Sequence, residues 1–173
     1  MKKRLLLAGV IFIAIAAIMA VFYNFTLSPQ GTTTESREEI LNTTISAGTN
    51  WTIATETVIE GHIISAAYST DNKVSLAIFK PAENGGYEFQ TSTNCNADEI
   101  IISNVVINQD SYDLVWFNGS QTEYAELIYT VGNQPQEALK FNTNDMSIIC
   151  AKSPAKEYTL WVSYYDHDGN KYK

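Results

Sequence analysis

Oxygen-bearing side chains alternate near the C-terminal end of the sequence, at Asp166, Asp168 and Asn170. Carboxylate and amide oxygens at alternate positions are typical of calcium-binding loops. An EF-hand loop would need glycine at its sixth position, whereas Gly169 is only the fourth residue of this segment. The pattern therefore favours a tight hairpin turn, and a calcium site here would need further ligands from other loops.

Aromatic side chains form a second candidate site just before this turn. Trp161 and Tyr165 fall on one face of an alternating segment whose other face is an apolar row, made of Tyr158, Leu160, Val162 and Tyr164. If that row is core, Trp161 and Tyr165 are exposed, together with Tyr124 of another predicted strand. Exposed rings on a sheet can stack on sugars or anchor a protein partner. The alternative is a structural role, in which the rings pair across strands with Tyr124 and Ile128.

Catalytic groups form no recognisable motif. The two histidines, His62 and His167, stand in no Ser-His-Asp or Cys-His pattern, and the sequence contains no G-x-S-x-G, phosphate loop or dinucleotide fingerprint. Nothing selects a pair among the 19 acidic residues for glycoside cleavage. We therefore expect no enzymatic activity and no cofactor; a hydrolase with an unrecognised site is the alternative.

The two cysteines, Cys95 and Cys150, leave two possibilities open. Outside the cytoplasm an even number of cysteines favours a disulfide, which would close a loop of about 55 residues. As free thiols, Cys150 would act as a small hydrophobe in an apolar run, and Cys95 would lie in an exposed turn. Without a supporting histidine cluster, the pair does not predict a zinc site.

The N-terminal residues predict the membrane topology of the chain, and with it the compartment of the residues described above. Three basic residues at positions 2–4 precede nineteen uncharged ones, Leu5–Tyr23. As a helix this run would span about 28 Å, close to the thickness of a bilayer's hydrocarbon core. The positive-inside rule places residues 1–4 in the cytoplasm and the rest outside. We expect a single-pass plasma-membrane protein. The alternative is a secreted protein, in which the N-terminal segment is a signal peptide that is removed by cleavage near Ala20.

The charge of the chain restricts its partners. The formal net charge is −8. Without positions 2–4, eight basic residues stand against nineteen acidic ones, which leaves −11 on the predicted exported part. Such a surface repels nucleic acids and anionic lipid headgroups, so we expect no nucleic-acid partner.

The remaining sequence predicts two regions. Residues 24–48 lack apolar periodicity and are predicted to be a flexible linker, although Ser36 and Glu39 have capping-box spacing that allows a short helical turn. Residues 49–173 alternate apolar and polar side chains, and turn residues punctuate them at short intervals. This pattern predicts nine or ten strands in an all-β, antiparallel β-sandwich. The clearest alternation is at 73–80, 87–90, 112–117, 124–131 and 158–164.

The segment Tyr158–Asn170 resembles the closing hairpin of bacterial immunoglobulin-like repeats, which often end an alternating strand in an acidic turn with Asp-Gly-Asn. The resemblance covers thirteen residues and implies an immunoglobulin-like sandwich. Trp116 lies between the two cysteines, but Cys95 falls in a predicted loop, so the Cys–Trp–Cys spacing of immunoglobulin domains is not met.

Together these features predict a tethered, extracytoplasmic binding or accessory module. The predicted tether, the acidic surface and the aromatic strand face are consistent with contact to another envelope protein or to a cell-wall polymer. Besides the hydrolase, a structural assembly subunit is the other alternative.

Overall fold

The computed structural model describes residues 30–45, 49–83, 85–143 and 146–173. The predicted cytoplasmic end, residues 1–4, and the predicted membrane segment, Leu5–Tyr23, lie outside these ranges. Within them, no helix is both long and apolar enough to cross a membrane.

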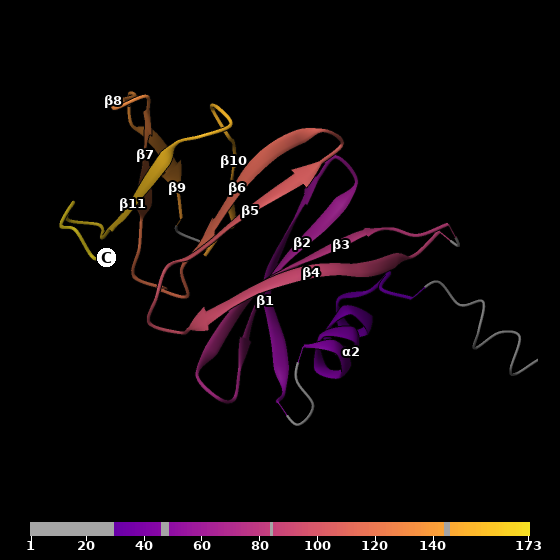
Figure 1. The fold of residues 1–173 in the computed structure, drawn as a ribbon. Coiled ribbons are helices and arrows are strands. Elements are labelled where there is room, and N and C mark those ends of the chain that lie inside the picture. The colour runs from indigo at the N-terminus through magenta and orange to yellow at the C-terminus, as the bar shows by residue number, and fades with distance from the viewer. Residues whose placement is uncertain (1–29, 46–48, 84, 144–145) are drawn as a thin grey trace, which may run out of the picture.

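The described part of the chain contains one helix, α2 (Thr34–Thr44), and three antiparallel sheets (Figure 1). Sheet A has the strand order β1-β2-β3-β4, with β1 (Trp51–Ile59), β2 (His62–Ser69), β3 (Lys73–Pro81) and β4 (Tyr87–Asn96). Sheet B has the order β10-β6-β5, with β5 (Ile101–Ile107), β6 (Asp110–Trp116) and β10 (Ile149–Lys152). Sheet C has the order β11-β7-β8, and β9 also pairs with β7; its strands are β7 (Tyr124–Val131), β8 (Gln134–Pro135), β9 (Leu139–Asn142) and β11 (Thr159–Tyr165).

The predicted all-β class is confirmed, and the antiparallel sheets are consistent with a β-sandwich. The topology differs from the two-sheet immunoglobulin-like arrangement, because the strands from Ile101 onward divide into sheets B and C. Apolar and polar side chains alternate along the strands of sheet B and of sheet C alike. The pattern therefore identifies the buried face of each strand, but it does not show which sheet covers that face.

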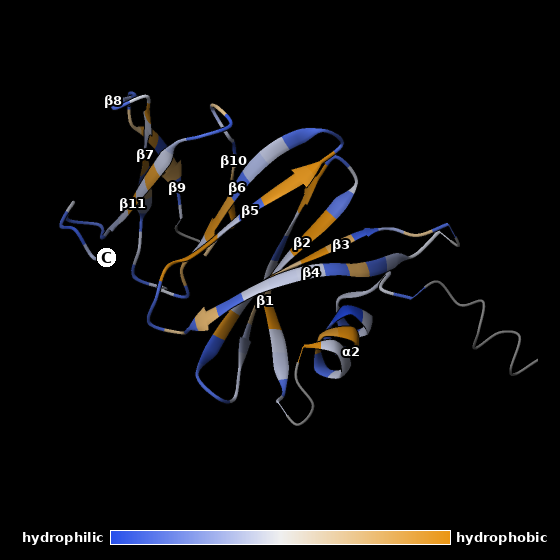
Figure 2. Ribbon diagram, in the orientation of Figure 1, coloured by the Kyte–Doolittle hydropathy of each residue, from blue (hydrophilic) through white to orange (hydrophobic). Residues whose placement is uncertain are grey.

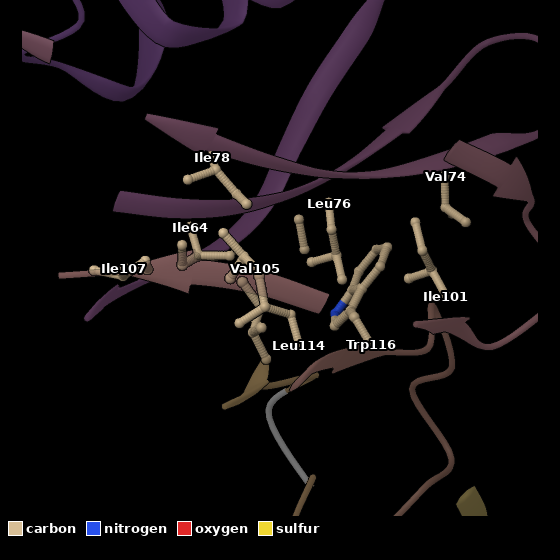
Figure 3. Packing of buried hydrophobic residues seen from close by; sticks show 11 residues of the cluster. Ile64, Val74, Leu76, Ile78, Ile101, Val105, Ile107, Leu114 and Trp116 are labelled. Atoms are coloured by element: carbon tan, nitrogen blue, oxygen red, sulfur yellow. The ribbon is translucent and has the colours of Figure 1, made fainter. Parts of the chain in front are cut away.

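The main core lies between sheets A and B (Figure 3). Val74, Leu76 and Ile78 of β3 point into it, as their alternation predicts, and meet Trp116 and Leu114 of β6. Figure 2 shows apolar segments on β2, β3 and β5, the strands that contribute to this layer. Ser75, Ala77 and Phe79 of β3 are also fully buried, and Ala77 and Phe79 pack in the cluster that includes Leu41 of α2.

Helix α2 corrects the predicted linker, because Thr34–Thr44 is part of the folded domain. Its capping box joins Thr33 and Ser36, three residues earlier than the predicted pair, and satisfies backbone N–H groups of the first turn. Leu41 is fully buried against sheet A, among Phe79 and neighbouring apolar side chains. Tertiary contact therefore stabilises a helix that is too short to be stable alone.

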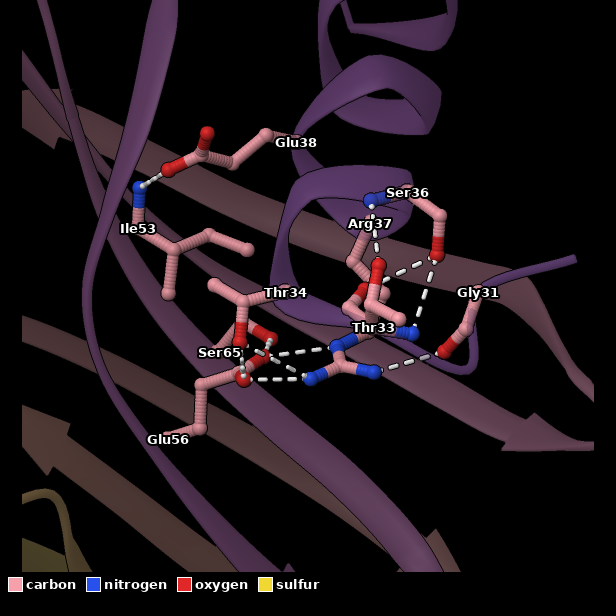
Figure 4. A network of polar contacts seen from close by, with 9 residues as sticks. All are labelled: Gly31, Thr33, Thr34, Ser36, Arg37, Glu38, Ile53, Glu56 and Ser65. Atoms are coloured by element: carbon pink, nitrogen blue, oxygen red, sulfur yellow. Dashed lines mark hydrogen bonds and ion pairs between the residues drawn. The ribbon is translucent and has the colours of Figure 1, made fainter.

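A buried ion pair joins α2 to sheet A (Figure 4). Arg37 is 5% exposed, and its Nε donates to Oε1 of Glu56 on β1 at 2.8 Å. The same carboxylate accepts hydrogen bonds from Ser65 of β2 and Thr34 of α2, and Arg37 also donates to the carbonyl of Gly31 at 2.6 Å. The charge of Glu56 is thus compensated by a cation and by two hydroxyl donors.

A second core lies between sheets B and C, and it fixes the orientation of β11. Tyr164 is 1% exposed in this core, and Tyr158, Leu160 and Val162 are partly buried against it. The predicted apolar row of this segment is confirmed. Since successive side chains of a strand point to opposite faces, Trp161 and Tyr165 lie on the outer face of sheet C.

Candidate functional site

The outer face of sheet C brings together the three aromatic residues that the sequence singles out. Strand β11 pairs with β7 so that Tyr165 lies opposite Tyr124 and Trp161 lies opposite Ile128. On the other side of β7, Lys140 of β9 lies opposite Glu126. Residues directly opposite each other in an antiparallel pair share a face, so all of these side chains belong to one surface, which we call the aromatic face.

Tyr124 and Tyr165 form a cross-strand stack. Their ring centroids are 4.7 Å apart and their planes differ by 11°. This separation matches the spacing of neighbouring strands, so the rings stand side by side above the sheet. The ammonium of Lys140 lies 3.3 Å from the centroid of the Tyr124 ring. Tyr124 is therefore enclosed between a cation and a ring, which is the structural role that the sequence left open.

Trp161 differs from the two tyrosines, because its side chain is not enclosed. It is 67% exposed, the largest value among the exposed large hydrophobic residues of the described chain. Exposing a tryptophan leaves a large apolar ring in water, and such rings are enriched among the residues that dominate protein–protein binding. Trp161 is thus the residue of the aromatic face that is best placed to contact a partner.

Polar groups surround the stacked pair. The Tyr165 hydroxyl is hydrogen-bonded to Glu126, which raises the pKa of this phenol. An open depression of about 490 Å³ lies beside Tyr124, and Lys140, Glu123 and His167 contribute to its lining. His167 Nδ1 lies 2.7 Å from a carboxylate oxygen of Glu123. The rim of the face therefore offers charges of both signs.

The predicted calcium ligands form a hairpin turn in the structure. Asp166 Oδ1 accepts hydrogen bonds from the backbone N–H groups of Asp168, at 3.0 Å, and Asn170, at 2.8 Å. The hydrogen bond from the Asn170 backbone lowers the pKa of Asp166 most, and that from the Asp168 backbone lowers it further. Gly169 has a φ of 77°, which suits a tight turn. The described residues contain no group of three or more His, Cys, Asp and Glu side chains that could hold a metal ion.

Cys95 and Cys150 are free thiols in the structure. Cys95 lies within β4, and not in the loop that the sequence predicts, whereas Cys150 lies in β10 within the predicted apolar run. Both are partly buried against the core between sheets A and B. Burial raises the pKa of Cys150 to about 11, so its thiolate is scarce near neutral pH.

The two histidines lie in different surroundings. His62 Nδ1 is 3.4 Å from the carbonyl oxygen of Glu60 in the β1–β2 turn, while His167 contacts Glu123 in the C-terminal turn. In neither of these contacts does the histidine meet a nucleophile. The hydrolase alternative therefore gains no support from them.

A polar cluster that the sequence does not predict surrounds Asp113, between sheets B and C. Asp113 is 2% exposed and accepts hydrogen bonds from Tyr158, Tyr129 and Asn104, at 2.5, 3.0 and 3.0 Å. Its position opposite the apolar row of β6 suggests a solvent-facing carboxylate, but sheet C covers that face. Donors from β5, from β7 and from the residue just before β11 meet at one carboxylate, so we assign this cluster a structural role.

No protein-family model, curated protein or solved structure matches this chain.

Proposed function

We propose that this protein is a binding or accessory module, anchored outside the plasma membrane by Leu5–Tyr23, that contacts another envelope protein or a cell-wall polymer. The contact is made by the aromatic face of sheet C. The anchor is a proposal from the sequence alone, resting on the basic residues 2–4 and the uncharged run that follows them.

The observation that carries the proposal is the exposure of Trp161. An indole ring that is 67% exposed in the middle of an ordered strand contributes little to the core beneath it. Binding by a partner would remove its apolar surface from water and would stabilise a complex by about 2 kcal/mol or more. Tyr124 and Tyr165 support this role by stiffening the neighbouring part of the face, since they are already stacked on each other.

The test is recovery of a partner from chemically crosslinked envelope membranes with the full-length chain. The proposal expects a specific protein or polymer with the wild type and a several-fold loss with Trp161→Ala. Tyr68→Ala is the matched control, because Tyr68 is another exposed aromatic residue, on sheet A, at 42%. Equal recovery with wild type and Trp161→Ala would contradict the proposal.

A further inference from the structure

The described residues cover only part of the outer edge of β11. In the described part of sheet C, β11 is the terminal strand, and its inner edge pairs with β7. On its outer edge, the backbone N–H of Tyr172 donates to the carbonyl of Tyr164 at 2.7 Å, and the N–H of Tyr164 donates to the carbonyl of Lys173 at 3.0 Å. A bridge between Tyr165 and Lys171 completes this contact. Residues 171–173 thus lie antiparallel to the last residues of β11.

These contacts establish which way the backbone groups of β11 point. Both backbone groups of Tyr164 are bonded on the outer edge, while the carbonyl of Tyr165 accepts from Glu123 at 2.8 Å, on the side of β7. Along an antiparallel strand, the residues whose backbone groups bond to a given neighbour alternate. The N–H and C=O groups of Val162 and Leu160 therefore point to the outer edge, where none of the described strands lies beside them.

We propose that this open stretch, Leu160–Val162, binds an extended peptide segment of the partner, which adds a strand to sheet C. The inference rests on the proposed function and specifies how its ligand is held. Main-chain hydrogen bonds to Leu160 and Val162 supply part of the affinity, and Trp161, between them on the outer face, selects an apolar side chain opposite it. Residues 171–173 mark the line along which the added strand runs.

An extended polypeptide fits this edge better than a glycan does. The open groups are donor and acceptor pairs repeated at two-residue spacing, and another extended backbone matches such a row. Sugar hydroxyls have no corresponding repeat. Stacking on Trp161 would suffice for a glycan and would leave the backbone groups of Leu160 and Val162 in water, so the two ligand classes predict different protection of these amides.

Charge favours a different protein over a second copy of this chain. Acidic residues greatly outnumber basic ones beyond residues 2–4, with nineteen against eight, so two copies repel each other. The open edge is short and offers few hydrogen bonds to offset this repulsion. Two cations, Lys171 and Lys173, belong to the C-terminal residues that lie along the edge. We therefore expect the added strand to come from a partner that is neutral or basic overall.

The test adds a short segment after Lys173 of this chain. Because residues 171–173 already lie beside β11, a short extension of alternating threonine and valine continues along the same edge and occupies it within the molecule, at high effective concentration. The matched control is an extension of equal length with proline at the positions whose N–H groups would face β11, so that these ladder donors are missing. Backbone amide exchange at Leu160 and Val162 reports occupancy, and capture from crosslinked envelopes reports partner binding.

We expect the threonine–valine extension to slow exchange at Leu160 and Val162 by about tenfold or more and to abolish partner capture, while the proline extension changes neither. Unslowed exchange with the threonine–valine extension would overturn the inference, because the edge would not accept a strand. Capture that persists although both amides are protected would also overturn it, and release by polysaccharide digestion would then identify a glycan. If Trp161→Ala leaves capture intact as well, the proposed function itself fails.

Discussion

Arg37 of α2 and Glu56 of β1 form a buried ion pair across the boundary between the helix and sheet A. The pair holds in place a helix whose sequence offers few apolar side chains, and it does so with hydrogen bonds that satisfy both partners. Breaking such a pair by removing one member leaves the other charge buried without compensation, which costs far more than the pair contributes when intact.

Replacing Arg37 tests this relationship. We expect Arg37→Met to lower the free energy of unfolding by about 2–4 kcal/mol, because Glu56 would keep its burial and lose its cation. The measurement is denaturant unfolding of the purified full-length chain. Lys80→Met is the control, since Lys80 forms an exposed pair with Glu88 at 2.7 Å and should change stability by about 0.5 kcal/mol or less. Equal losses in the two variants would contradict the assignment.

We expect low pH to weaken the ion pair between Arg37 and Glu56. Burial raises the pKa of Glu56, but hydrogen bonds from Arg37, Ser65 and Thr34 outweigh it, so its pKa lies below the ordinary value of 4.5. A lowered folded-state pKa stabilises the fold above pH 4.5, and this contribution is lost as the pH falls through the lowered value. We expect the stability difference between wild type and Glu56→Gln to be constant near neutral pH and to shrink below pH 4.5. A difference that does not change with pH would contradict this account.

Gly31 is placed where no other residue fits. Its φ is 69°, and a Cβ atom there would lie 2.5 Å from the carbonyl oxygen of Tyr87. We expect Gly31→Ala to destabilise the fold by at least about 2 kcal/mol, from backbone strain and displacement of the helix entry. Gly132→Ala provides the comparison, because Gly132 also has a positive φ, of 55°, but open space around it. Its cost should be about 1 kcal/mol. Thermal unfolding of both variants measures these costs. A larger loss of stability with Gly132→Ala than with Gly31→Ala would refute the assignment.

Trp116 and Trp161 are expected to have different roles, the first in stability and the second in binding. Trp116 is fully buried, and its Nε1 donates to the carbonyl of Met146 at 2.8 Å, so Trp116→Ala should cost about 3–5 kcal/mol. Trp161→Ala should change the free energy of unfolding by about 0.5 kcal/mol or less, because Trp161 lies outside the core. Denaturant unfolding of both variants checks this contrast. A large loss with Trp161→Ala would assign this residue to the fold instead of to a partner.

The sequence predicts the strands and their buried faces well, since alternation records burial directly. The rows of β3 and β11 are correct because each has a core on the predicted side. Helix α2 could not be identified as part of the domain, because Arg37, a residue type that is usually exposed, is buried against its ion-pair partner Glu56 on another element. Asp113 was missed for a similar reason, since sheet C covers the face that alternation assigns to water.

The candidate site could be predicted only in part. Trp161 and Tyr165 follow from the face of one strand, but the stacking of Tyr165 on Tyr124 depends on the register between β11 and β7. No hairpin turn sets that register, because β8, β9 and β10 come between the two strands in the sequence. The open edge of β11 is a property of sheet order. No pattern along the chain reports which strand ends a sheet or where residues 171–173 lie beside it.

Hydroxyl-radical footprinting of the chain in intact envelopes and in purified form, read out by mass spectrometry at Trp161, tests most directly whether a partner covers this residue. Tyr68 is the internal reference, because it is exposed on sheet A, away from the aromatic face. We expect Trp161 to be oxidised several-fold more slowly in the envelope than in the purified chain, while Tyr68 reacts equally in both. Equal oxidation of Trp161 in the two preparations would contradict this expectation.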